Sequence, residues 1–122
     1  MAAIEELMHD YFRILHEGDT AGIERIFLPT CELNCPNADG SLTHMTREEY
    51  INAVSGRETP IGLGYPKIGT VMLIDQAGPN MALVKVDCAV QPRYFTDYLT
   101  LIKQDGEWKI AAKVYYVTKV EQ

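Results

Sequence analysis

The sequence of 122 residues has only three cysteines, three histidines and one tryptophan. Cys31, Cys35 and Cys88 are an odd number without Cys-x-x-Cys spacing, which argues against a disulfide framework or a zinc site. No His-Glu-x-x-His segment, Cys/His cluster or Asp-rich calcium loop is present. We therefore expect no metal and no cofactor, and we interpret the cysteines as buried thiols.

Basic charge is also scarce. Eleven Lys and Arg against seventeen Asp and Glu give a net charge of -6, which disfavours binding of nucleic acid. No basic amphipathic helix and no apolar run long enough for a membrane span occur, so we expect no membrane partner. The N-terminus lacks the basic and apolar regions of a signal peptide, which predicts a cytoplasmic protein.

The composition that remains is that of an ordinary globular protein. Hydrophobic residues make up 47% of the chain and charged residues 23%. A domain of this length buries roughly two-thirds of the surface of its unfolded chain, enough for a core of its own. We expect residues 1–122 to form a single domain.

The first part of the chain has helical spacing. Apolar residues between positions 4 and 17 follow one helical stripe, which indicates an amphipathic helix on a core. Gly18 supplies a stop, and Asp19 or Thr20 can cap a short second helix that ends before Pro29. Thr46 and Glu49 have the spacing of a capping box and predict the start of a third helix.

Strand patterns fill most of the rest. Residues 31–36 and 42–45 are expected to form a hairpin, and the glycine- and proline-rich segment 56–66 a long loop. Four longer strands are predicted at 67–76, 81–91, 94–103 and 107–119, separated by turn residues. Helices followed by an antiparallel meander predict an α+β fold, with the helices on one face of the sheet.

The turn Asp105-Gly106 sets the expected register of the last hairpin. A two-residue turn pairs Gln104 with Glu107 and, in a regular ladder, places Asp97 opposite Val114. The predicted inward face then holds Phe95, Asp97, Leu99, Leu101, Trp108, Ile110, Ala112, Val114 and Tyr116. The predicted outward face holds Tyr98, Thr100, Ile102, Lys109, Lys113 and Tyr115.

Asp97 is the polar exception on that inward face. A buried carboxylate is costly unless it is paired or hydrated, so it is either structural or functional. As a functional group it would be a general base or a ligand anchor in an apolar pocket. As a structural group it would be bonded to the backbone, solvent or a lysine such as Lys113, or turned outward by a register slip.

Three other side chains are candidates for the same site. Tyr11 lies at the inward centre of the first helix, as plain core or with its hydroxyl aimed into a cavity. His44 lies on a short strand, faces either way, and is a candidate pocket acid or base. Cys88 points inward, but no nearby base activates it, so we expect a packed thiol.

Several segments together resemble one known family. Residues 11–12, 17–19, 27–29, 45–50, 95–101 and 105–113 look like the branch of the nuclear transport factor 2-like superfamily called putative lumazine-binding proteins. The resemblance implies a cone-shaped α+β fold with three N-terminal helices packed on a curved antiparallel sheet and a cavity between them. At residues 28–31, Leu-Pro-Thr-Cys replaces the branch's usual His-Pro-Asp-Ala, so chemistry assigned to that His and Asp does not transfer.

The resemblance also implies a homodimer whose sheets pack face to face. The outward face of the predicted sheet is more apolar than solvent requires, as a two-fold self-contact would explain. We expect Tyr98, Thr100, Lys113 and Tyr115 to form that contact.

Three hypotheses for function follow. The first is a binding protein for a small apolar or planar ligand. Its largely apolar pocket would be lined by Met8, Tyr11, Phe12, Leu15, Val86, Cys88, Asp97 and Tyr116. The second is an isomerase-, dehydratase- or cyclase-like enzyme in which Asp97 shuttles a proton while Tyr11 or His44 polarises a carbonyl. The third is a dimeric module that docks another protein.

Overall fold

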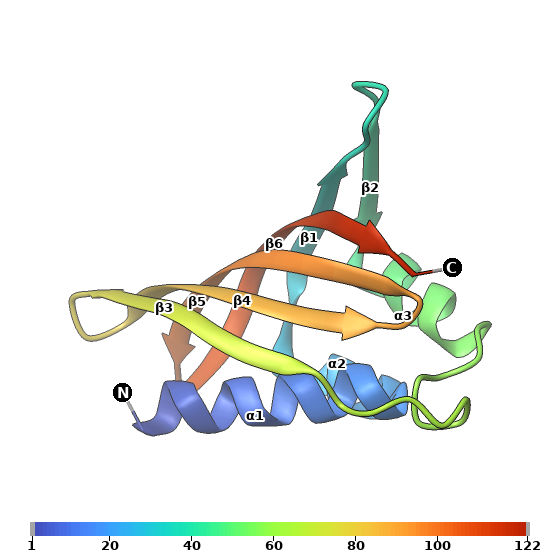
Figure 1. Cartoon of the computed structure of the whole chain (residues 1–122). Helices are drawn as coiled ribbons and strands as arrows, with labels where there is room; N and C mark the ends of the chain where they lie inside the picture. The colour runs from blue at the N-terminus through green and yellow to red at the C-terminus, as the bar shows by residue number, and fades with distance from the viewer. Residues whose placement is uncertain (1, 122) are drawn as a thin grey trace.

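The computed structural model describes residues 2–121, in which three helices cover one face of a curved, unclosed six-stranded sheet (Figure 1). The α+β architecture predicted from the sequence is confirmed. The helices are α1 (Ala2–Glu17), α2 (Thr20–Ile26) and α3 (Arg47–Ser55). The strands are β1 (Phe27–Pro36), β2 (Leu42–Thr46), β3 (Gly69–Ala77), β4 (Met81–Val90), β5 (Arg93–Gln104) and β6 (Glu107–Val120).

The helix starts follow from their capping residues. Asp19 caps α2, because its carboxylate accepts a hydrogen bond from the backbone N–H of Gly22 at 3.0 Å. At α3 the expected capping box is present: the Thr46 hydroxyl accepts from the Glu49 N–H at 3.2 Å, and Glu49 accepts from the Thr46 N–H at 2.9 Å. These local bonds fix where each helix begins.

The first strand begins earlier than the sequence pattern indicates. β1 starts at Phe27, directly after α2, and runs through Pro29. Its pairing with β6 is irregular between Phe27 and Glu32, and such an interruption tolerates a proline that cannot donate to the ladder. The short helix ends at Ile26, and the start of β1, not Pro29, terminates it.

The strand order is β2-β1-β6-β5-β4-β3. Neighbouring strands are antiparallel except β1 and β6, which run parallel. The connection from β1 to β6 is long. After β1 the chain forms β2 and α3, crosses to β3 at the far edge of the sheet, and returns through β4 and β5 to β6. This arrangement pairs β1 with residues 110–114 of β6, while α3 packs against β1 and β2.

A β-bulge in β6 overturns half of the predicted register. Leu101 pairs with Ile110, but Thr100 pairs with Ala112, so Ala111 has no partner across the ladder. The extra residue reverses the faces of the residues that follow it. Lys113 and Tyr115, expected outside, point inward, opposite Leu99 and Asp97. The residues wrongly predicted to face the core are Ala112, Val114 and Tyr116; Val114 is 47% exposed and Tyr116 52%.

One apolar cluster joins the helices to the inner face of the sheet. Tyr11, Ile14 and Ile4 of α1 are completely buried, and they pack with residues of β4, β5 and β6. Among residues 2–121, no helix is long and apolar enough to cross a membrane.

Candidate functional site

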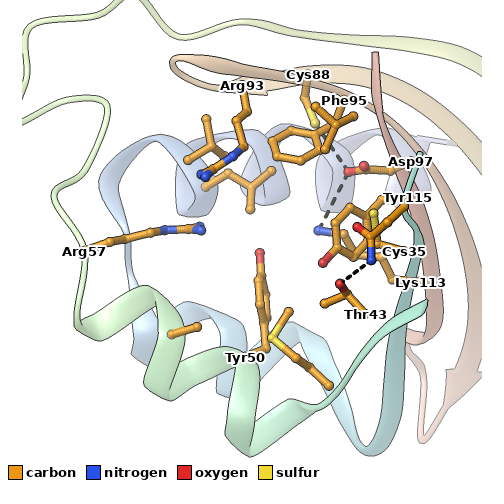
Figure 2. A pocket seen from close by; sticks show the side chains of 16 residues that line it. Cys35, Thr43, Tyr50, Arg57, Cys88, Arg93, Phe95, Asp97, Lys113 and Tyr115 are labelled. Carbon is orange, nitrogen blue, oxygen red and sulfur yellow. Dashed lines mark hydrogen bonds and ion pairs between the residues drawn. The ribbon is translucent and has the colours of Figure 1, made fainter. Parts of the chain in front are cut away.

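A cavity of about 290 Å³ lies between the sheet and the helices, at the border of the apolar core. Figure 2 shows it bounded by the inner face of the sheet, by α1 and by α3. The residues that line it are Leu15, Cys35, Asn37, Thr43, Met45, Tyr50, Ala53, Arg57, Cys88, Val90, Arg93, Phe95, Asp97, Lys113, Tyr115 and Val117. Apolar, aromatic and charged groups therefore share this space, whereas the sequence predicted a largely apolar pocket.

Asp97 anchors the polar side of the cavity. Its Oδ2 accepts a hydrogen bond from the Tyr11 hydroxyl at 2.5 Å and from the Cys88 thiol at 3.3 Å. The Nζ of Lys113 lies 3.8 Å from the same oxygen. The Asp97 side chain is 1% exposed and the Lys113 side chain 6%. Asp97 is thus held by partners from α1, β4 and β6, and its other oxygen, Oδ1, has no hydrogen-bond partner among residues 2–121.

Three tyrosine rings surround the ammonium group of Lys113. Its Nζ lies 5.1 Å from the ring centre of Tyr11, 5.0 Å from that of Tyr50 and 5.2 Å from that of Tyr115. Burial lowers the pKa of Lys113, but the neighbouring Tyr50 and Asp97 outweigh burial and leave the pKa above its ordinary value. Lys113 is therefore a cation at neutral pH despite its burial.

The two donors to Asp97 keep their protons. Burial and the nearby Asp97 carboxylate raise the pKa of the Tyr11 phenol well above its usual range. The same two causes raise the pKa of the Cys88 thiol. A thiol that stays protonated is a poor nucleophile, so Cys88 acts here as a weak donor.

The cavity collects some of the residues predicted for it. Leu15, Cys88 and Asp97 line it. Tyr11 is completely buried, does not line the cavity, and contributes through its hydrogen bond to Asp97. The other predicted apolar residues, Met8, Phe12 and Val86, are buried in the core cluster.

Tyr116 and His44 require correction. The bulge in β6 places Tyr116 on the outer face of the sheet, away from the cavity. His44 lies on β2 between the cavity-lining Thr43 and Met45, and alternation along a strand turns it to the opposite side. There its Nε2 lies 2.8 Å from Glu32 Oε1, with 41% of its side chain exposed. Neither side chain reaches Asp97.

Sequence reasoning missed much of the polar lining. Lys113 and Tyr115 were assigned to the wrong face because a bulge within a run of alanines has no clear sequence signal. Tyr50 was not among the residues predicted for the site. Arg57 and Arg93 lie on the loop after α3 and at the start of β5, and only the folded chain brings them to one cavity (Figure 2).

The described residues hold no obvious metal centre. In positions 2–121, no group of three or more His, Cys, Asp and Glu side chains is placed to hold a metal ion.

Comparison with known proteins gives a family and a fold. The family described as putative lumazine-binding matches residues 1–116. No curated protein matches the chain.

Solved structures share the architecture at low sequence identity. A nuclear transport factor 2-like protein of unknown function from Shewanella baltica is 21% identical with a TM-score of 0.84, covering 97% of this chain and 93% of its own. Another from Silicibacter pomeroyi is 22% identical, with a TM-score of 0.78 and coverages of 95% and 93%. A ketosteroid isomerase-like protein from Erwinia carotovora atroseptica is 14% identical, with a TM-score of 0.73 and coverages of 97% and 95%. At these identities the likeness establishes the nuclear transport factor 2-like fold.

Proposed function

The chain belongs to the family described as putative lumazine-binding, and from this premise we propose that it binds a small planar molecule in the cavity between sheet and helices. One observation carries the proposal: a space of about 290 Å³ remains between the sheet and the helices, beside a cluster of buried apolar residues. This volume is close to the lower end of the roughly 300–1,000 Å³ of known ligand pockets. Phe95, Tyr50 and Tyr115 supply flat apolar walls for such a ligand.

The arrangement around Asp97 favours binding over proton transfer. A proton shuttle at a carbonyl needs a carboxylate that is free to reach the substrate. The Oδ2 of Asp97 is instead held by Tyr11, Cys88 and Lys113, and the side chain, Oδ1 included, is buried and only 1% exposed. We therefore assign Asp97 to positioning the polar side of the pocket, and retain the enzyme as the alternative, which the stability of an Asp97→Asn variant tests.

Filling the cavity should abolish ligand binding. Ala53 of α3 lines the cavity, so an Ala53→Trp side chain would occupy the space that the ligand needs. Native mass spectrometry of the protein from its own host, before and after mild denaturation, should find a releasable small molecule on the wild type and none on the variant.

A matched control distinguishes filling of the cavity from a general disturbance of the fold by the added tryptophan. Asn52→Trp introduces the same ring at the neighbouring exposed position, which does not line the cavity. This control should retain the ligand. Absence of any adduct on the wild type would count against tight binding, and equal adducts on wild type and Ala53→Trp would place the ligand elsewhere.

We also propose that the chain forms a homodimer through the outer face of the sheet. Support comes from the large apolar side chains exposed there, because a contiguous apolar surface is unfavourable in water and marks an interaction site. They are Leu73, Met81, Leu83, Tyr98, Ile102, Val114 and Tyr116. Of the four residues predicted for the contact, Tyr98 and Thr100 remain candidates, while Val114 and Tyr116 replace Lys113 and Tyr115.

A charge at the centre of this face should dissociate the dimer. Val114 pairs with Tyr98 across the β5–β6 ladder, so Val114→Asp would bury two carboxylates, one per subunit, near the two-fold axis. Light scattering after size-exclusion chromatography should show a dimer for the wild type and a monomer for this variant. Leu42→Asp, at a 63% exposed position on β2, should stay dimeric. A monomeric wild type would refute the dimer.

A further inference from the structure

The five arginines of the chain divide into two groups. Arg13, Arg25 and Arg47 each form an ion pair with a carboxylate, at 2.8, 2.8 and 3.0 Å. Arg57 and Arg93 both line the cavity, and within residues 2–121 neither guanidinium has an ion-pair or hydrogen-bond partner. The arginines without a protein partner are thus the two that face the proposed ligand.

Their positions make the cavity polar at two opposite sides. Arg57 follows the end of α3, and Arg93 is the first residue of β5. Figure 2 shows both guanidinium groups reaching into the cavity from the side opposite Asp97 and Lys113. The Tyr50 side chain stands between these two sides, with its hydroxyl directed into the space.

The charges of the lining do not cancel. Lys113 is offset by Asp97, with which it forms an ion pair. No carboxylate in the lining offsets Arg57 and Arg93, so the cavity carries excess positive charge in a protein of net charge -6. A positive, partly enclosed site on a negative molecule concentrates anions at that point.

We infer that the cavity selects an organic anion, namely a planar apolar molecule with a carboxylate that Arg57 and Arg93 bind. This inference rests on the proposed function, because it names the class of ligand for the same cavity. Guanidinium forks bind carboxylates through paired, charge-assisted hydrogen bonds. The rings of Phe95, Tyr50 and Tyr115 contact the planar body, and the Asp97–Lys113 side bounds its far end.

The probes that test it are 2-naphthoate and its neutral counterpart 2-naphthamide, titrated by calorimetry. Wild type should bind naphthoate more tightly than naphthamide, by about tenfold or more. Arg57→Gln and Arg93→Gln should each weaken naphthoate binding by about ten- to a hundredfold and leave naphthamide binding unchanged. Lys103→Gln, which removes a positive charge from an exposed residue outside the lining, should change neither by more than about twofold.

The outcomes distinguish failure of the anion preference from failure of the proposal that the cavity binds a ligand. Equal binding of both probes, unaffected by the arginine variants but lost in Ala53→Trp, would overturn the anion preference and retain the cavity as a ligand site. Naphthoate binding that weakens equally in Lys103→Gln and the arginine variants would also overturn it, because the effect would then be one of net charge. If neither probe binds the wild type, the inference fails, and the native mass spectrum alone decides the proposed function.

Discussion

Asp97→Asn is expected to destabilise the protein by about 3–5 kcal/mol at pH 7, the usual cost of removing one partner from a buried ion pair. Asparagine keeps the shape of the side chain and can still accept the Tyr11 hydrogen bond. What it removes is the one carboxylate that, within the described residues 2–121, pairs with Lys113, whose side chain is 6% exposed. The ammonium group would remain among three tyrosine rings without a counter-ion, so the free energy of unfolding should fall.

Urea unfolding at pH 7 measures this loss as a lower midpoint. Asp75→Asn provides the control, since Asp75 is exposed on β3 and its substitution should change stability by no more than about 0.5 kcal/mol. The double variant Asp97→Asn/Lys113→Met removes both charges and should recover a large part of the loss. An Asp97→Asn protein as stable as the wild type, or more so, would contradict the paired carboxylate and restore Asp97 as a free acid for catalysis.

The parts of the fold that the sequence predicted are those governed by local rules. Asp19 and the Thr46–Glu49 pair set helix starts through hydrogen bonds within a few residues, and both predictions are confirmed. The Asp105-Gly106 turn also behaves as expected, because both residues adopt positive φ and Gln104 pairs with Glu107. Such features depend on residue type and spacing alone.

The candidate site depends on strand register and on contacts between segments that are far apart in the sequence. The inward direction of Lys113 and Tyr115 follows from one unpaired residue, Ala111, whose side chain does not distinguish a bulge from a regular strand. A single extra residue reverses every later side chain, so an error at one alanine moved Tyr116 into the predicted pocket and Lys113 out of it. Arg57 and Arg93 line one cavity because the loop after α3 and the start of β5 border the same space.

The close approach of α1 to the edge strand β3 leads to the second large effect. Gly69, the first residue of β3, lies against the ring of Phe12, and a Cβ built at this position would overlap the ring carbons. Alanine normally stabilises a strand relative to glycine, by about 0.5–1 kcal/mol. Here steric overlap opposes that gain, because Phe12 is 6% exposed and packed into the core.

Gly69→Ala should therefore destabilise the protein by about 1–3 kcal/mol, the cost of overpacking a core. Gly56→Ala is the control: a Cβ there meets its nearest neighbour at 3.6 Å, an ordinary contact, so little change is expected. Adding Phe12→Leu to Gly69→Ala should remove the overlap, so the two changes together should cost less than the sum of their separate effects. Strict additivity in chemical unfolding would show that α1 does not rest on the bare backbone of Gly69, and the position of this helix beneath the sheet would need another explanation.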